Sequence, residues 1–542
     1  MSNRKFLYLN LTSIFVTLAL TPWANVDSLI IPKIILLFAS ASYLLPYVVT
    51  EFKFYLSKSK TKVLLTIIIL FILQMLIVMI VSPAPLEQQI FGRSGRGLGF
   101  ITEISLLIIM LAAVKYVSFK QLHYLLFALL FASIGSSAYS ISQKNGFDFF
   151  QWNTTTNGII GTLGNPNFQS SLAALTVIPA LSYLRHKKTL VKCFSVLMSL
   201  ILIYTVYICQ STQGYILITL SGCVFLIIYF RYKNLVVFFS LSAAAGITSI
   251  TAIAGMLNYG PLSNFLYKTS VTSRGEFWRT ALTTTRKHPI FGVGIDSFGD
   301  VSSMYKSARD AAGVNEFTDN AHNYFLHYSS TGGLPLLILY TALILLTFLS
   351  FFQIQRNLGR FDFRLASIFT FFVGFQAQSI ISPGTISLMI WNSLICGSII
   401  GLSVSGIEDI QFKPAQSNSL IKGAGCLTLI ISLLVTYPLY NSDRLQLKSL
   451  QTKDALLAVK AAKLYPESSL RYSRIGVELL KSGLLEQALE VGRSAVKFNP
   501  NSIQAWALVL ANTSAPIEER KQARQEILRL DPFNTEIQNI VL

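Results

Sequence analysis

Long apolar runs separated by short polar segments dominate the chain from its N-terminus to about residue 440. Runs of about 17 to 25 apolar residues are long enough to cross a hydrocarbon core as helices, and about thirteen runs meet this criterion. Beyond residue 440 a charged, helix-favouring sequence follows. The pattern predicts an all-α protein, with a polytopic membrane bundle of about 12 or 13 helices in residues 1–440 and a small helical domain in residues 441–542.

Composition and charge agree with this architecture. Hydrophobic residues make up 52% of the chain and charged residues only 13%, against about 25% charged in a soluble domain. The excess of basic over acidic residues, 44 against 25, would suggest a nucleic-acid partner in a soluble chain. Here the basic residues gather in alternate loops such as "RHKKTLVK", "RYK" and "RNLGRFDFR", a pattern typical of cytoplasmic loops. We therefore expect no nucleic-acid partner, a cytoplasmic N-terminus, and a large loop 258–322 and C-terminal domain on the periplasmic or outer face.

The C-terminal segment repeats itself. Pro466 and Ala461 superimpose on Pro500 and Ala495, a period of about 34 residues that resembles a tetratricopeptide array. Stacked helix pairs of this kind bury a core only against their neighbours. We expect this domain to pack against the bundle or to dock a protein partner, and none of its residues is predicted to be catalytic.

Arginine in an outward loop runs against the positive-inside rule. In "FGRSGRGLGF", Arg93 and Arg96 stand among four glycines. Glycine lets backbone N–H groups approach a ligand, and guanidinium groups bind phosphate oxygens in bidentate fashion. The pair is a candidate phosphate site; the alternative is a flexible loop whose arginines contact lipid headgroups.

The large outer loop contains a predicted helix over residues 274–288. Ser273 and Glu276 form a capping-box pattern, and Pro289 closes the segment. Arg274 and Trp278 share one face of this helix. The alternative is an amphipathic helix lying in the membrane interface.

Two of the five histidines stand at the start of the next apolar run, in "NAHNYFLH". With Asp319 or Asn320 as N-cap, His322 falls in the first helical turn, where the helix terminus would lower its pKa and keep it able to accept a proton. Asn323 shares a face with His327, which we expect to act as a supporting hydrogen-bonding residue. The alternative is a structural histidine at the interface. Gln213 adds a polar group at another outer helix end, and the five cysteines show no metal-binding spacing.

These motifs resemble those of the O-antigen ligase and polymerase superfamily. The resemblance rests on "RGEFWRTALTTTRKHPIFGVGIDSFG", on "NAHNYFLHYSSTGGLPLLI" after it, and on "GTLGNPN" at residues 161–167. It implies a GT-C-like glycosyltransferase of the bacterial inner membrane that uses a polyprenyl diphosphate-linked glycan donor without a metal or other cofactor. By motif, the resemblance implies that Arg274 binds the diphosphate, with Arg93 and Arg96 as further candidates, and that His322 activates the acceptor, which is a lipid, a growing glycan or a protein. The chain departs from many members at Gln213, near an expected arginine, and at Thr331, where an acid is common.

A membrane transporter of a small anion such as bicarbonate is the alternative function. Transport would predict ionisable or broken-helix positions near the middle of the membrane. The apolar runs here carry almost no charge at their centres, and polar groups collect at one face. The sequence therefore favours the transferase.

Overall fold

The computed structural model describes residues 2–148, 158–256, 259–266, 269–311, 317–405 and 419–542. Parts of the predicted outer loop, residues 258, 267–268 and 312–316, lie outside these ranges. Within the described ranges every regular element is a helix and no strand occurs. The all-α prediction is confirmed.

Ten helices of the described chain are long and apolar enough to cross a membrane. Most of them bury one face against other helices and leave apolar side chains on the outside of the bundle, as expected of helices that face lipid. The ten are α2 (Ile30–Thr50), α4 (Ser59–Val81), α7 (Leu122–Lys144), α9 (Thr189–Ile208), α10 (Thr212–Phe230), α11 (Leu235–Met256), α16 (Tyr324–Leu358), α17 (Phe363–Ile381), α18 (Ile386–Ser405) and α19 (Ser419–Thr452).

Three slightly shorter helices complete the bundle: α1 (Ser2–Leu18), α6 (Phe100–Tyr116) and α8 (Pro166–Leu181). With them the bundle holds the set of helices that the apolar runs predict. Helix α8 begins as a good N-terminus should, because the Asn165 side chain accepts a hydrogen bond from the backbone N–H of Asn167 and Pro166 occupies the first turn. Short helices join the long ones: α3 (Phe52–Ser57), α5 (Leu86–Phe91) and the 3-10 segments Phe119–Gln121, Gly161–Leu163 and Ser182–Arg185.

Helices α6 and α18 form the centre of the bundle. The apolar span of α18 is completely buried. A Cβ placed on Gly397 would lie 2.2 Å from the carbonyl oxygen of Met110, and one on Gly401 would lie 2.2 Å from that of Val114. These two glycines, four residues apart, let the two backbones touch, as small residues do between membrane helices.

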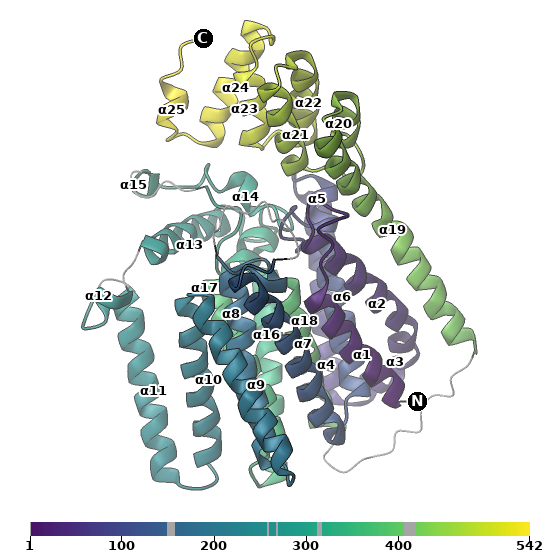
Figure 1. Ribbon diagram of the computed structural model, residues 1–542, viewed down its shortest axis with the longest axis vertical. Coiled ribbons are helices and arrows are strands. Elements are labelled where there is room, and N and C mark those ends of the chain that lie inside the picture. Colours follow the sequence, from purple (N-terminus) through teal and green to yellow (C-terminus); the bar gives the residue numbers. More distant parts are fainter. Residues whose placement is uncertain (1, 149–157, 257–258, 267–268, 312–316, 406–418) are drawn as a thin grey trace.

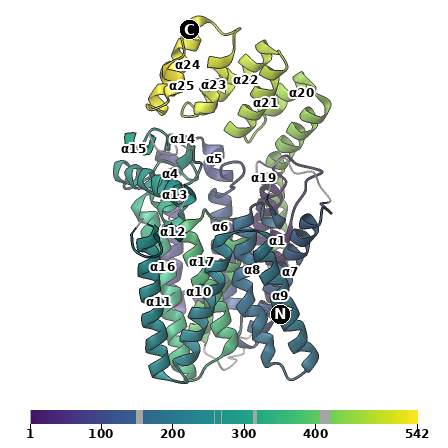
Figure 2. The same ribbon diagram turned by 60° about the vertical axis from the view of Figure 1, so that its left-hand side comes forward.

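The predicted outer segments gather at one end of the bundle (Figures 1 and 2). The longer helix α13 (Thr269–Lys287) and three short helices, α12 (Ser263–Leu266), α14 (Phe298–Val301) and α15 (Ala308–Ala311), lie below the C-terminal helices. The basic turn at residues 231–234 lies at the opposite end, between α10 and α11 (Figure 1). The large loop and the C-terminal domain thus share one side, as the charge pattern predicts.

Helix α19 joins the bundle to the C-terminal domain without a break. It passes through residue 440, where the sequence predicts the domain boundary, and continues to Thr452. The Asp443 carboxylate accepts hydrogen bonds of 2.6 and 3.1 Å from the backbone N–H groups of Val26 and Asp27. The connection between the two parts is therefore a continuous helix fixed to the loop before α2, and not a linker.

The C-terminal domain consists of paired helices. Helix α23 begins at Ile503, 34 residues after α21 begins at Ser469, so the sequence period corresponds to one helix pair. Two small apolar clusters form its core, one around Tyr472 and one around Trp506. The helices are α20 (Ala455–Ala462), α21 (Ser469–Lys481), α22 (Leu485–Phe498), α23 (Ile503–Ala511), α24 (Ile517–Leu530) and α25 (Thr535–Gln538). The tetratricopeptide assignment itself stays a prediction.

Candidate active site

The two halves of the sequence signature, residues 289–294 and 330–334, lie against each other at a kink in α16. Three backbone hydrogen bonds of 2.7 to 3.0 Å join them. Gly333 breaks the helix with φ 79° and ψ 173°, and a Cβ at this position would lie 2.1 Å from the carbonyl oxygen of Ile290. Only glycine fits this approach. The kink therefore holds the segment after α13 against α16.

Helix α13 carries Arg274 and Trp278, as predicted, but it begins at Thr269. The prediction that Ser273 caps a helix over residues 274–288 is wrong, because Ser273 lies inside the helix and is buried. A capping preference contributes only about 1 kcal/mol, and residues 269–272 contain no glycine or proline to stop the helix one turn earlier.

His322 lies before the helix and not in its first turn. Helix α16 begins at Tyr324, and its N-cap is Asn323, whose side-chain oxygen accepts a hydrogen bond of 3.1 Å from the N–H of Leu326. The predicted N-caps Asp319 and Asn320 are therefore wrong. His322 adopts the left-handed conformation, φ 50°, which costs a non-glycine residue about 1–3 kcal/mol and is common at functional sites.

The start of α16 is anchored in the bundle by a buried carboxylate. The hydroxyl groups of Tyr324 and Tyr328 donate hydrogen bonds of 2.8 and 2.9 Å to the two oxygens of Glu103 on α6. All three side chains are buried. This contact fixes the helix that follows His322 to the central helix of the bundle.

Helix α13 and the arginine loop flank His322. The Trp278 indole N–H reaches the carbonyl oxygen of His322 at 3.5 Å, and the Phe277 ring lies 5.3 Å from the imidazole. Burial lowers the pKa of His322 to about 4; the charges of Arg96 and Arg274 act in the same direction, and Asp319 opposes them. The imidazole is therefore neutral at neutral pH and able to accept a proton. The pKa of His322 is therefore lowered by burial and by the two arginines. The sequence had suggested a helix terminus as the cause.

Arg274 is a partly buried cation without a carboxylate partner in the described part of the chain. Burial lowers its pKa, and no neighbouring charge acts on it. A desolvated, unpaired charge is costly, so such groups normally face a counter-ion or an anionic ligand. Since Arg274 also acts on the pKa of His322, it presents an unsatisfied positive charge beside the imidazole.

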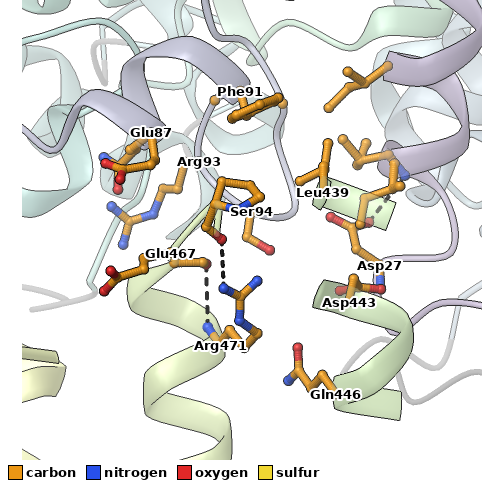
Figure 3. Close-up of a pocket in the computed structure, with 18 residues that line it drawn as sticks. Asp27, Glu87, Phe91, Arg93, Ser94, Leu439, Asp443, Gln446, Glu467 and Arg471 are labelled. Atoms are coloured by element: carbon orange, nitrogen blue, oxygen red, sulfur yellow. Dashed lines mark hydrogen bonds between the residues drawn. The ribbon is translucent and has the colours of Figure 1, made fainter. Parts of the chain in front are cut away.

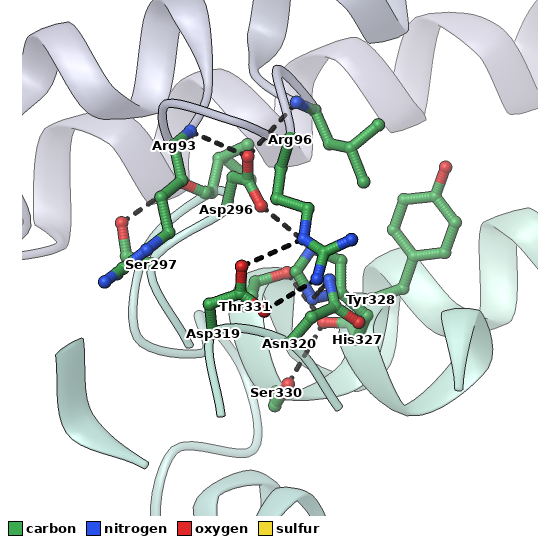
Figure 4. A network of polar contacts seen from close by, with 12 residues as sticks. Arg93, Arg96, Asp296, Ser297, Asp319, Asn320, His327, Tyr328, Ser330 and Thr331 are labelled. Carbon is green, nitrogen blue, oxygen red and sulfur yellow. Dashed lines mark hydrogen bonds and ion pairs between the residues drawn. The ribbon is translucent and has the colours of Figure 1, made fainter. Parts of the chain in front are cut away.

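Arg93 and Arg96 come together with His322, but each is paired with an aspartate. The Arg96 guanidinium donates two hydrogen bonds of 2.9 Å to Asp319. Arg93 forms an ion pair of 2.6 Å with Asp300. Figure 4 shows Arg96 directed at Asp319 between the glycine-rich loop and the loop before α16. The arginines are thus held in position, and an anionic ligand must compete with carboxylates for them.

Asp296 ties the arginine loop to the signature segment. Its Oδ2 accepts hydrogen bonds from the backbone N–H groups of Arg93, at 2.8 Å, and Leu98, at 3.1 Å. The loop closes tightly here, since a Cβ on Gly99 would lie 2.2 Å from the backbone nitrogen of Gly92. Asp296 is buried and left-handed, with φ 52°. The glycines therefore serve loop closure around a carboxylate, in addition to the ligand approach that the sequence suggested.

A buried chain of polar contacts runs from Asp296 through His327 to Asn320 (Figure 4), and Asn320 contacts the backbone of His322. The Asp296 Oδ1 lies 3.4 Å from His327 Nε2, and His327 Nδ1 lies 3.1 Å from the amide nitrogen of Asn320. The amide oxygen of Asn320 accepts the backbone N–H of His322 at 3.1 Å. That last bond fixes the amide orientation, so Asn320 donates to Nδ1 and the imidazole proton of His327 faces Asp296. His327 therefore supports the strained backbone of His322.

Gln213 lies in a separate neutral cluster. Its amide nitrogen donates to the Ser171 hydroxyl at 3.0 Å, and its oxygen accepts from Ser382 at 2.9 Å. These contacts join α10 to α8 and to the end of α17. Among the described contacts none links Gln213 to His322. Thr331, the second departure, donates to the carbonyl oxygen of His327 at 2.7 Å.

A cavity lies beside the arginine loop, where Arg93, Asp27 and Asp443 face the C-terminal domain (Figure 3). Arg471 reaches into it, but its guanidinium donates to the carbonyl oxygens of Leu464 and Pro466 and to the Ser442 hydroxyl. The bond to Ser442 joins α21 to α19. Arg471 is a structural residue of the domain junction.

Sequence reasoning missed the acidic half of the site. Asp296 lies in a glycine-containing segment for which the sequence predicts no role, Asp300 directly follows this segment, and Asp319 is predicted only as a helix cap. One signal was present, because outward arginines and these few acids of the same outer face are expected to neutralise each other. The spacing of residues along the sequence does not predict which of two residues about 200 positions apart form an ion pair.

Comparison with known families gives the site its context. Residues 197–341 match the family model described as O-antigen ligase. This segment is therefore similar to the O-antigen ligase domain. It contains Arg274, Trp278, His322 and Asn323, whereas Arg93 and Arg96 lie before it. No curated protein matches the chain. The match supports glycan transfer of the O-antigen ligase type and gives no support to anion transport.

Proposed function

We propose that this protein transfers a glycan from a polyprenyl diphosphate-linked donor to an acceptor hydroxyl. The observation that carries the proposal is the unpaired, partly buried Arg274 beside the neutral imidazole of His322. A base close to an unsatisfied cation is what this substitution needs, since a hydroxyl must lose a proton and a diphosphate must leave.

The donor diphosphate binds first to Arg274. Its further oxygens then compete with Asp319 for Arg96 and with Asp300 for Arg93. A diphosphate carries more charge than one carboxylate and accepts bidentate hydrogen bonds from guanidinium groups. Because the aspartates hold the arginines in place before the donor arrives, less conformational entropy is lost on binding.

In the transfer step the acceptor oxygen attacks the anomeric carbon of the donor sugar. A carbon–oxygen bond forms there as the bond from the same carbon to the diphosphate oxygen breaks. His322 takes the acceptor proton, and the electron pair of the broken bond stays on the leaving diphosphate. Arg274, with Arg96 and Arg93, stabilises the charge that develops on that group.

Asn320 and His327 act as positioning residues in this reaction. The contact to the His322 backbone holds a conformation that costs about 1–3 kcal/mol, so the imidazole stays directed at the substrate. Pre-organisation of this kind lowers the barrier because the base does not reorient during the reaction. Neither residue touches the reacting atoms.

The acceptor is a hydroxyl of a lipid, a growing glycan or a protein. The end of the bundle that carries the site and the C-terminal domain faces the periplasm, in keeping with basic loops at the other end. The C-terminal helices lie over this end (Figure 2), where an acceptor or a protein partner would approach. No metal or other cofactor takes part in the proposed mechanism.

The test is glycan transfer by the purified full-length protein in EDTA, with a polyprenyl diphosphate-linked donor and lipid, glycan and protein acceptors in parallel. We expect transfer to one acceptor class, and loss of transfer in Arg274→Ala. The matched control is Arg286→Ala, an exposed arginine on the same helix, which should transfer normally. Absence of transfer by the wild type to every acceptor, or normal transfer by folded Arg274→Ala, would refute the proposal.

A further inference from the structure

A polar cleft lies between the outer loop and the C-terminal domain. It has a volume of about 130 Å³, well above the roughly 10–15 Å³ needed for one water molecule. The segment after α13 supplies one wall, with His288 and Tyr305, and the turn after α22 supplies the other, with Asn499 and Asn501. The cleft thus exists only because the C-terminal domain is docked on the outer loop.

The C-terminal domain is fixed at this place by specific contacts. Asn499 is buried, and its amide nitrogen donates to Asp300 at 3.1 Å. Asp300 in turn holds Arg93. Met304, from the outer loop, packs against the apolar cluster around Trp506. The Asp300 carboxylate therefore contacts both Asn499, in the wall of the cleft, and Arg93, a proposed diphosphate-binding residue.

The polar groups of the lining carry little net charge. His288 Nε2 and the Tyr305 hydroxyl lie 2.7 Å apart. Burial, together with the charge of Lys287, lowers the pKa of His288 from its ordinary value, which favours the neutral imidazole. The Asp300 charge is compensated by Arg93. Lys287 is not a lining residue, although its ammonium lies 4.9 Å from the centre of the Tyr305 ring. The residues that do line the cleft offer hydroxyl groups both donors and acceptors.

Apolar side chains complete the cleft. Pro83, Val293, Val301 and Met304 line it beside the polar groups. A pyranose ring presents hydroxyl groups at its edge and C–H groups on its faces, so it matches a lining of amide, phenol and imidazole groups next to aliphatic carbon. Ligand sites generally combine such apolar walls with a few placed polar groups.

Helix α13 sets the distance from the cleft to the chemistry. Trp278 contacts the carbonyl group of His322, and His288 follows ten residues later. A helix rises 1.5 Å per residue, so the cleft lies roughly 15 Å along this helix from the proposed base. A ligand in the cleft is too far from His322 to react there. It is close enough to be another part of the same substrate chain.

We infer that this cleft is a glycan subsite, in which a neutral sugar unit of the substrate chain binds between the outer loop and the C-terminal domain while its reacting end lies at His322. The inference rests on the proposed function and gives the C-terminal helices a part in substrate binding. The sugar belongs either to the donor glycan or to an acceptor glycan, since both present the same hydroxyl chemistry.

Direct binding tests the subsite without any transfer reaction. The probe is the free oligosaccharide released by mild acid from the cell's polyprenyl diphosphate-linked glycan, titrated into the full-length protein in detergent. We expect Asn501→Ala and Tyr305→Phe each to weaken binding about tenfold, the effect of losing one hydrogen-bonding group. The matched control is Asn539→Ala, an exposed asparagine outside the cleft, which should bind as the wild type does.

Transfer kinetics then distinguish the source of the sugar. If the donor glycan occupies the cleft, the two cleft variants raise the KM for donor and leave the KM for acceptor unchanged; an acceptor glycan gives the opposite pattern. Unchanged oligosaccharide affinity in both folded variants would overturn the subsite. Wild-type protein that binds the oligosaccharide but transfers nothing would refute the proposed function and leave the subsite standing.

Discussion

Arg96 and Asp319 form a bidentate ion pair, with two hydrogen bonds of 2.9 Å, three residues before His322. Although burial opposes it, the pairing with Arg96 lowers the pKa of Asp319 to about 2. The pair therefore stays ionised across the physiological range, and it sets the charge around the proposed base. A diphosphate that takes Arg96 leaves the Asp319 carboxylate free beside the imidazole.

The ion pair predicts a pH dependence. Because the pKa of His322 is about 4, kcat/KM should stay constant as pH falls through 6.5 and decrease only near pH 4, where the imidazole becomes protonated and can no longer accept a proton. Replacing Arg96 by glutamine removes a cation that disfavours protonation and frees Asp319, which favours it. The acid limb of Arg96→Gln should therefore move upward by about one pH unit or more.

Arg93→Gln is the matched control for that experiment, since Arg93 does not contribute to the pKa shift of His322. Its pH profile of kcat/KM should keep the acid limb near pH 4 even if donor binding weakens. An Arg96→Gln limb at the wild-type position would contradict the electrostatic role given to Arg96.

His322→Ala should lower kcat by about 10²- to 10⁴-fold, the usual contribution of a general base. Donor affinity should change little, because the arginines remain. The comparison is His123→Ala, an exposed histidine at the start of α7, which should leave transfer unchanged. Transfer at the wild-type rate by folded His322→Ala would remove the base from the mechanism.

Arg274→Lys should retain the charge but lose bidentate contact, so we expect weaker donor binding and a partial loss of kcat/KM, smaller than that of Arg274→Ala. The measurement is donor affinity by titration alongside transfer rate. Equal donor affinity in the wild type, Arg274→Lys and Arg274→Ala would show that the diphosphate binds elsewhere.

Asn320→Ala should separate positioning from binding. It removes the contact between His327 and the His322 backbone, so kcat should fall about tenfold while the KM for donor stays constant. Loss of a buried hydrogen-bonding group should also destabilise the protein by about 1–3 kcal/mol. Asn320→Asp keeps the acceptor for the His322 N–H and should recover part of kcat; no recovery relative to Asn320→Ala would argue for a purely structural role.

Gly397→Ala tests the contact between the central helices. The new Cβ would lie 2.2 Å from the carbonyl oxygen of Met110, and overpacking of this kind costs about 1–3 kcal/mol. We expect a lower thermal-unfolding midpoint in detergent. Gly423→Ala on α19, where a Cβ meets open space, should leave the midpoint unchanged or raise it. Equal midpoints for the two variants would contradict the close approach.

Much of the architecture could be predicted because the bilayer imposes it. Apolar runs of fixed length, basic loops on one side and a 34-residue period are local or periodic properties of the sequence. They predict the helical bundle, the helical C-terminal domain and the common side of the large loop and that domain. Helix starts were less accurate, since Asn323 caps α16 in place of the predicted Asp319 or Asn320, and cap preferences differ by only about 1 kcal/mol.

The sequence by itself determined the membrane bundle and the chemical groups of the candidate site, because hydrophobic periodicity and motif order are local properties of the sequence. These groups are Arg93, Arg96, Arg274 and His322. Only the tertiary structure decided the partners of these groups. Asp319 pairs with Arg96 and Asp300 pairs with Arg93 across about 200 to 220 positions of sequence. Asp296 lies beside His327, about 30 positions away, and Asn499 reaches Asp300 across 199 positions. Such pairings depend on which helices pack together, and packing is set by the sum of many contacts and not by any local pattern.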